Sequence, residues 1–329
     1  MCALILFFEA TTESLRTRKD NMLLSVQDVI QKGLDMVRIS KEQQQLMSQE
    51  RCTEIFRKHY GSSPLDLADQ WYDLTTTDVP LAALSKDEKT MQGFECFMRA
   101  HYFLWSYPRN AEQFARMFGV HEKKVRGKFV WDWIERVAAL EMKKIKFPTS
   151  LGDDPPVIAF SVDGTDLKCN EPHNHPRYPI DSQMKSDKFN KAGWKYLVAM
   201  LVHKAQIVAV LGPYKASKSE LTVFRENLKE KLRSLPGVVA SGDLGFCTSE
   251  TDETEPPLFC YPNSMDPKEV RNYKSRVRCR QESLFGRLKF FRILSDTFKY
   301  SKEKHNMAFR AVAVTVQYQM DNGSPVFTV

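Results

Sequence analysis

The stretch VIAFSVDGTD, residues Val157–Asp166, decides the fold of the second half of the chain. Its first five residues are mostly apolar, which is typical of a buried strand. The strand leads into Asp163, and we predict a sharp turn at Gly164, because glycine permits such backbone conformations. A carboxylate at the end of a core strand is costly unless a cation meets it. An Asx turn that closes the strand is the alternative interpretation of Asp163.

Two further carboxylates occur in similar settings. Asp243 follows a short apolar run in VVASGDLGF, and Glu282 lies in the basic helical stretch RVRCRQESLFGRLKFFRIL. Three carboxylates delivered by two strand ends and one helix are what a two-metal phosphodiester site needs. The sequence therefore predicts that Asp163, Asp243 and Glu282 converge.

Charge is concentrated around the third of these carboxylates. The chain has a net charge of +7, and Lys268–Arg310 holds thirteen Lys and Arg against four Asp and Glu. Such clustering favours a polyanionic partner, DNA or RNA, over a merely solvated helix face. The seven cysteines are scattered without a C-x-x-C pair, which indicates reduced, intracellular usage. We find no stretch long enough to cross a membrane.

The segment AEQFARMFGVHEKKVRGKF, Ala111–Phe129, has the spacing of a helix-turn-helix. Ala115 is small enough for a second helix to approach, Gly119 suits the tight turn, and Val125 returns to the core six residues later. A plain helical hairpin is the alternative. The predicted recognition helix would bring these DNA-binding residues: His121, Lys123, Lys124 and Arg126.

The second half of the chain predicts a layered α/β domain, because strands come first and helices follow. After the first strand we expect two strands joined near His203–Ala205, a helix, and another short strand before Asp243. A long helix then opens at Asp266-Pro267. The expected elements are strands at Val157–Ser161, Trp194–Val202, Gln206–Leu211 and Val238–Ala240, and helices at Ser219–Leu235 and Lys302–Met320.

The three acidic stretches, SVDGTD, SGDLGF and RCRQESLFGRLKFFRIL, resemble the acidic motifs of DDE transposases, in detail those of the PIF/Harbinger group. The similarity covers roughly residues 155–320 and includes the closing KHNMAFRAVAVTVQYQ. Two features depart from the group. Ser219-Glu220 stands where relatives often carry an Asp, and an acidic loop, TSETDETEPP, precedes the third motif.

The resemblance implies an α/β fold with an RNase H-like mixed sheet flanked by helices, preceded by an all-α helix-turn-helix domain. It implies that Asp163, Asp243 and Glu282 are catalytic and bind Mg²⁺ or Mn²⁺, as two ions, and that the protein cleaves and joins DNA. Three adjacent carboxylates require such cations on physical grounds, and Mg²⁺ prefers oxygen ligands. Phosphates beside the site would be held by Arg278, Arg280, Arg287 and Lys289.

The implied partners are double-stranded DNA, as transposon ends and target, a second copy of the chain, and a second DNA-binding protein. No membrane partner is expected, and a nuclear location follows from the family analogy alone. We divide the chain into an N-terminal helical or uncertain region (1–84), a helix-turn-helix DNA-binding domain (85–147), a linker rich in turn residues (148–156) and a catalytic domain (157–329).

Other interpretations compete with an active transposase. The chain is alternatively a non-catalytic DNA-binding protein descended from a transposase, or a plain RNase H-like nuclease without strand transfer. Cys169, His173 and His175 could bind zinc with Cys247 or Cys260, although the spacing matches no trusted pattern. Ordinary loop residues are the simpler interpretation of these side chains.

Overall fold

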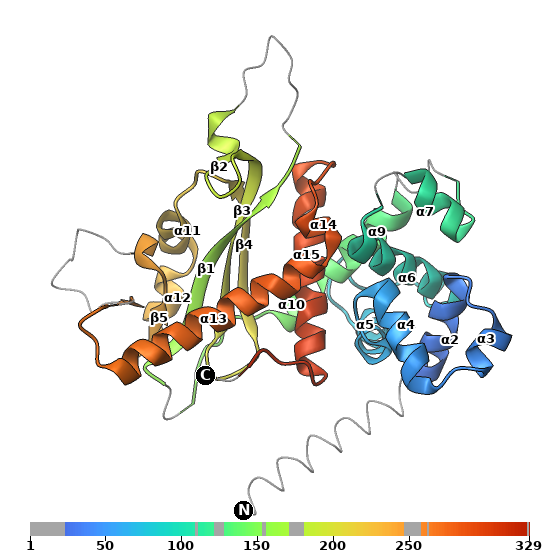
Figure 1. Ribbon diagram of the computed structural model, residues 1–329, viewed down its shortest axis with the longest axis horizontal. Coiled ribbons are helices and arrows are strands. Elements are labelled where there is room, and N and C mark those ends of the chain that lie inside the picture. The colour runs from blue at the N-terminus through green and yellow to red at the C-terminus, as the bar shows by residue number, and fades with distance from the viewer. Residues whose placement is uncertain are drawn as a thin grey trace, which may run out of the picture.

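The computed structural model describes residues 24–108, 111–121, 128–152, 156–170, 181–246, 258–261, 263–327 and 329. A group of helices from the first half of the chain packs beside a mixed sheet from the second half, with the C-terminal helix between them (Figure 1). The described helices of the first half are α2 (Val26–Met36), α3 (Lys41–Gln45), α4 (Gln49–Tyr60), α5 (Pro64–Thr76), α6 (Met91–Ser106), α7 (Ala111–Phe118), α9 (Lys128–Ala139) and α10 (Glu141–Lys144).

Serine caps explain where several of these helices begin. The side chains of Ser25 and Ser63 each accept a hydrogen bond from the backbone N–H three residues on. The carboxylate of the acidic residue at that position in turn accepts from the backbone N–H of the serine. Ser85 and Glu88 make a related contact, in which the Ser85 backbone N–H and hydroxyl both donate to the Glu88 carboxylate. It closes a turn instead of a helix, because α6 begins later and is capped by Thr90.

The sheet has six strands in the described residues. Its order is β4-β3-β1-β5-β6, with β2 pairing the beginning of β3. The strands β1, β3 and β4 are antiparallel neighbours, whereas β5 and β6 run parallel to β1. The bounds are β1 (Ile158–Lys168), β2 (Lys185–Ser186), β3 (Lys191–Leu201), β4 (Ile207–Lys215), β5 (Val239–Ser241) and β6 (Phe259–Cys260). This is the predicted α/β class, with a mixed sheet flanked by helices.

The predicted turn at Gly164 is wrong, because β1 continues through it. Asp163 pairs with Val198 of β3, and Gly164 pairs with Leu197. A Cβ at Gly164 would lie 2.1 Å from Oε1 of Glu220, so the missing side chain makes room for that carboxylate. The predicted end of the next strand at Leu211 is wrong as well. Strand β4 runs on through Gly212-Pro213 to Lys215, and its pairing with β3 shifts register beside this dipeptide.

Helices cover both faces of the sheet (Figure 1). On one face, α11 (Glu220–Asn227) and α12 (Lys229–Arg233) pack Phe224 and Leu232 against Val162, and the single predicted helix is interrupted at Leu228. The other face is covered by α13 (Lys268–Phe290), α14 (Arg292–Ser295) and α15 (Lys302–Asp321). The first-half helices share this second hydrophobic core, so the predicted linker separates the two regions along the chain and not in packing.

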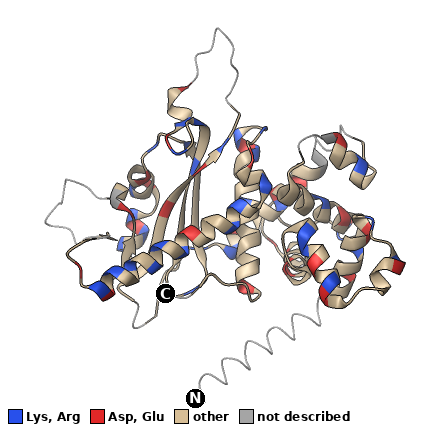
Figure 2. Cartoon of the chain, in the orientation of Figure 1, with Lys and Arg blue, Asp and Glu red and all other residues tan. Residues whose placement is uncertain are grey.

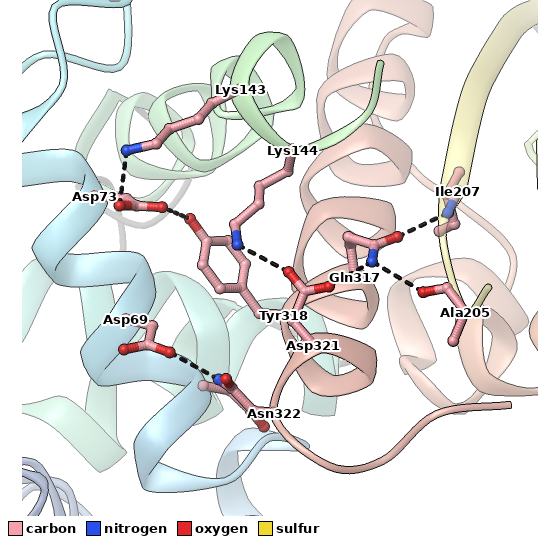
Figure 3. A network of polar contacts seen from close by, with 11 residues as sticks. Asp69, Asp73, Lys143, Lys144, Ala205, Ile207, Gln317, Tyr318, Asp321 and Asn322 are labelled. Atoms are coloured by element: carbon pink, nitrogen blue, oxygen red, sulfur yellow. Dashed lines mark hydrogen bonds and ion pairs between the residues drawn. The ribbon is translucent and has the colours of Figure 1, made fainter. Parts of the chain in front are cut away.

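Helix α15 joins the two regions through polar contacts (Figure 3). Gln317 accepts the N–H of Ile207 at 2.8 Å and donates to the carbonyl of Ala205 at 3.1 Å. One residue on, the Tyr318 hydroxyl donates to Asp73 of α5 at 2.6 Å. The sheet is therefore fixed to the N-terminal helices through one central helix. None of the described helices combines the length and the apolar character that crossing a membrane requires.

Candidate metal centre

Three carboxylates meet beside the central strand. Asp163 lies in the middle of β1, Asp243 follows the parallel neighbour β5, and Glu220 is the first residue of α11. Each offers an oxygen that lies within 4.8 Å of the others. Three acids at this separation repel one another unless cations lie among them, and carboxylate oxygens are the ligands that Mg²⁺ and Mn²⁺ prefer. The donor set therefore fits a divalent hard metal.

The electrostatics of the group point the same way. Burial, and next the negative charge of Glu220, raise the pKa of Asp163 to about 6. Burial also raises the pKa of Glu220. The ammonium groups of Lys195 and Lys188 lie 3.8 and 4.0 Å from a Glu220 oxygen, too far for direct hydrogen bonds. The two lysines thus compensate the negative charge only in part.

A small cavity adjoins Asp163 and Asp243. Its volume is about 50 Å³, and its walls include Ser161, Gln281 and Arg278. A water molecule needs about 10–15 Å³ of such space, so the cavity has room for an ion or a few water-sized groups. Gln281 fixes α13 on the sheet, since it accepts a bond from the Ser161 hydroxyl at 2.7 Å and donates to the Val198 carbonyl.

Glu282, the third predicted ligand, does not belong to this carboxylate group. Its exposed side chain pairs with Arg278, Nε to Oε1 at 3.2 Å, one helical turn back. Arg278 lines the cavity, so Glu282 is connected with the cavity through its ion pair with Arg278. In the sequence, Glu220 stands out only as part of a departure from the family pattern. Its one local signal is its position at the start of the helix that follows the antiparallel strands.

The four basic residues predicted on α13 have different environments. Arg278 and Lys289 are exposed. Partial burial of the Lys289 ammonium group and the charge of Lys188 lower its pKa, and the charges of Asp166 and Asp163 oppose this effect. The prediction for Arg280 is wrong, because its side chain is 1% exposed and donates to the carbonyls of Leu201 and Val202. A guanidinium enclosed in this way cannot contact DNA.

Arg287 is half-buried, and its guanidinium donates to the backbone carbonyls of Ser324 and Pro325 near the end of the chain. Burial lowers its pKa. These contacts occupy the donors that a phosphate would need, so of the four predicted residues Arg278 and Lys289 remain the best placed to hold phosphates.

Only the beginning of the predicted helix-turn-helix lies within the described residues. Helix α7 ends at Phe118, and Gly119 has the left-handed φ of +62° that a tight turn needs. His121 is exposed. The remaining predicted DNA-binding residues, Lys123, Lys124 and Arg126, lie outside the described residues, as do His173, His175 and Cys247 of the alternative zinc site. Of that site, Cys169 is buried and Cys260 lies in β6.

Comparisons of the chain with protein-family models, with curated proteins and with solved structures gave no match.

Proposed function

We propose that the chain is a metal-dependent DNA endonuclease of the DDE transposase type, which cleaves phosphodiester bonds and transfers strands. The observation that carries the proposal is the meeting of Asp163, Glu220 and Asp243 at the centre of the sheet. The strand order supports an RNase H-like core, since three antiparallel strands are followed by two parallel ones and the acids lie on the central strand and just after its parallel neighbour.

Mg²⁺ or Mn²⁺, as two ions, would supply an activated oxygen nucleophile and stabilise the leaving oxygen when bound. Asp163 and Asp243 would hold the metal, because they face the same small cavity. Arg278 and Lys289 would hold substrate phosphates on either side, since both are exposed on α13. The hydrogen bond from Ser161 of β1 to Gln281 of α13 fixes this helix, and with it Arg278 and Lys289, relative to β1.

Glu220 and Glu282 are the two candidates for the third carboxylate ligand. Glu220 lies in the group in the structure, whereas Glu282 is the residue that the family resemblance favours. We favour Glu220, because Glu282 pairs with Arg278. The matched variants E220Q and E282Q separate the two. If Glu220 is the ligand, E220Q weakens Mn²⁺ binding in calorimetry about tenfold or more, and E282Q leaves it unchanged.

Nicking of duplex DNA tests the activity itself. Purified protein with Mg²⁺ or Mn²⁺ is expected to nick DNA, EDTA to stop the reaction, and Asp163→Asn to abolish it. Joining of pre-cut ends would distinguish strand transfer from plain hydrolysis. Metal-dependent nicking that is equally strong in D163N would come from a contaminant and would refute the assignment.

A non-catalytic DNA-binding protein is the second candidate, and one observation favours it. Lys195 lies within 4 Å of both Glu220 and Asp166, so protein cations already stand near the acids. On this alternative, calorimetry detects no divalent metal and DNA binding needs none. Metal binding that is lost in Asp243→Ala favours the enzyme.

We propose the partners and the location of the protein from the family resemblance. Double-stranded DNA, as transposon ends and target, is the proposed partner, with a second copy of the chain and a second DNA-binding protein beside it. A nuclear location is proposed on the same analogy. The helix α7 and the turn at Gly119 are compatible with a helix-turn-helix.

A further inference from the structure

A second cavity lies beside the carboxylate cavity. Its volume is about 330 Å³. All of its lining residues are polar, and half of them are cationic: Asn263, Ser264, Arg271, Lys274, Ser275 and Arg278. The last four recur at three- and four-residue spacing on α13, so they lie on one face of that helix. Asn263 and Ser264 come from the loop before the helix and complete the lining.

Two residues connect this cavity with the candidate metal centre. Lys274 and Arg278 line both cavities, and the smaller one also contains Asp163 and Asp243. Figure 2 shows Lys and Arg recurring along α13, the helix that lies across the sheet. A polymer bound at the carboxylates therefore has a cationic continuation toward the beginning of this helix.

The charges in the larger cavity are unequally compensated. Lys274 is held by Asp266 at 2.6 Å and by the carbonyl of Tyr261 at 2.8 Å, and Arg278 pairs with Glu282. Arg271 is exposed, and no acidic side chain among the described residues pairs with it. Arg271 therefore supplies the positive charge that remains for a ligand.

We propose that this cavity is a subsite for backbone phosphates of the DNA strand next to the scissile phosphodiester, with Arg271 as its main contact. The proposal rests on the proposed function, because it takes DNA as the substrate. Hydroxyl and amide side chains, here those of Ser264, Ser275 and Asn263, join Lys and Arg in contacting DNA phosphates. From Arg271 to Arg278 a helix rises about 10 Å, and one DNA strand advances about 3.4 Å for each nucleotide. The subsite thus spans about three nucleotides.

The test is the salt dependence of DNA binding, measured by fluorescence anisotropy on a short duplex of mixed sequence in EDTA. Each phosphate contact contributes about −0.9 to the slope of log K against log salt. Arg271→Ala is expected to make the slope less steep by about 0.9. When salt rises from about 50 to about 200 mM, the affinity of R271A for DNA should therefore fall about threefold less than that of the wild type.

Arg276→Ala is the matched control. Arg276 is an exposed arginine on the same helix, but it does not line the cavity. Equal slopes in R271A and R276A would overturn the proposal, and so would a wild-type chain that binds no DNA. Arg271-dependent binding of inorganic phosphate, without any effect of R271A on DNA, would assign the cavity to a free anion and overturn the polynucleotide assignment.

The readout is independent of catalysis. Binding in EDTA requires no metal, and D163N is expected to bind DNA at least as well as the wild type. If the protein does not nick DNA but the salt slope depends on Arg271, the subsite is supported and the proposed endonuclease activity is refuted. If the protein nicks DNA but R271A does not change the slope, the activity is supported and the subsite is refuted. Thermal melting of R271A and R276A checks that both variants fold, which their exposure favours.

Discussion

Within the described part of the chain, the acidic side chains of α5 and those of the candidate metal centre differ in what faces them. On α5, Asp73 accepts from the Tyr318 hydroxyl and from Lys143 at 2.8 Å, and Asp69 accepts from Asn322 at 3.0 Å (Figure 3). At the candidate metal centre, the bonds given to Asp163 and Asp243 come from the backbone N–H groups of Gly164 and Gly245.

The partners of an acid distinguish one that holds the fold together from one that is available to a metal ion. Donors from α10 and α15 meet the α5 group, so its charge is used to fix helices to one another. The acids of the candidate metal centre come from three separate elements and lie close together, and the ammonium groups of Lys195 and Lys188 offset their charge only in part. Such an arrangement costs free energy unless a cation offsets it. The first group should therefore matter for stability, and the second for metal binding and activity.

The largest expected effect is on catalysis. Asp163→Asn should lower the rate of DNA nicking about 10³-fold, since a metal site supplies several kcal/mol of transition-state stabilisation. In metal-free buffer the same variant should melt at the same or a higher temperature than the wild type, because one repelling charge is gone. Nicking rates and melting curves check both halves. A variant that loses activity only because it melts lower would place Asp163 with the structural acids.

The converse is expected for Asp73. Asp73→Ala removes the acceptor of the buried Tyr318 hydroxyl and should lower the free energy of unfolding by about 1–3 kcal/mol. The nicking rate of the folded fraction should not change. Urea unfolding gives the measurement, and the exposed Asp87→Ala is the control, expected within about 0.5 kcal/mol of the wild type. Equal stabilities of D73A and D87A would contradict the structural role.

The pH dependence separates the groups next. The pKa of Asp163 is raised to about 6 from its ordinary 3.8, so the folded state holds a proton more tightly than the unfolded state. Its contribution to the stability of the metal-free protein is therefore present at low pH and is lost as pH rises from about 4 to about 6. Metal affinity should change in the opposite direction, rising about tenfold per unit up to pH 6.

Melting and Mn²⁺ titration across this range, with D163N beside the wild type, isolate the contribution of Asp163. In D163N the part of both profiles that comes from this group should disappear. Wild-type and D163N profiles that run parallel from pH 4 to 6 would show that Asp163 titrates in its ordinary range.

Part of this arrangement could be predicted from the sequence. Apolar runs before Asp163 and Asp243 predicted strands, and neighbouring parallel strands bring such residues to one region of a sheet. The role of Arg280 was missed, although the spacing contained a signal. Arg280 lies three residues after Val277 and four before Leu284, on the apolar stripe itself. The basic composition of the helix concealed that position.

Glu220 could not be placed from the sequence. Its distance from Asp163 depends on the pairing register of β1 and β3 and on where α11 begins, and neither is a local property. Gly164 looked like a turn residue for the same reason. Glycine serves both in turns and where another group approaches closely, and only the neighbours in space separate the two uses.

Gly164→Ala provides the finest test of the comparison. Its Cβ would lie 2.1 Å from Oε1 of Glu220, the flexible end of a side chain, so the carboxylate should move while the strand stays in place. We expect a cost in stability below about 1 kcal/mol, since most of the strain is relieved by a rotamer change. The affinity for Mn²⁺ should fall about threefold to tenfold, because one ligand is displaced.

Calorimetry on G164A, E220Q and the double variant provides the measurement. If Glu220 is a ligand, the two changes are not additive, because the alanine acts through a carboxylate that E220Q has already removed. Full additivity would instead show that the alanine acts on the strand itself and not through the Glu220 carboxylate.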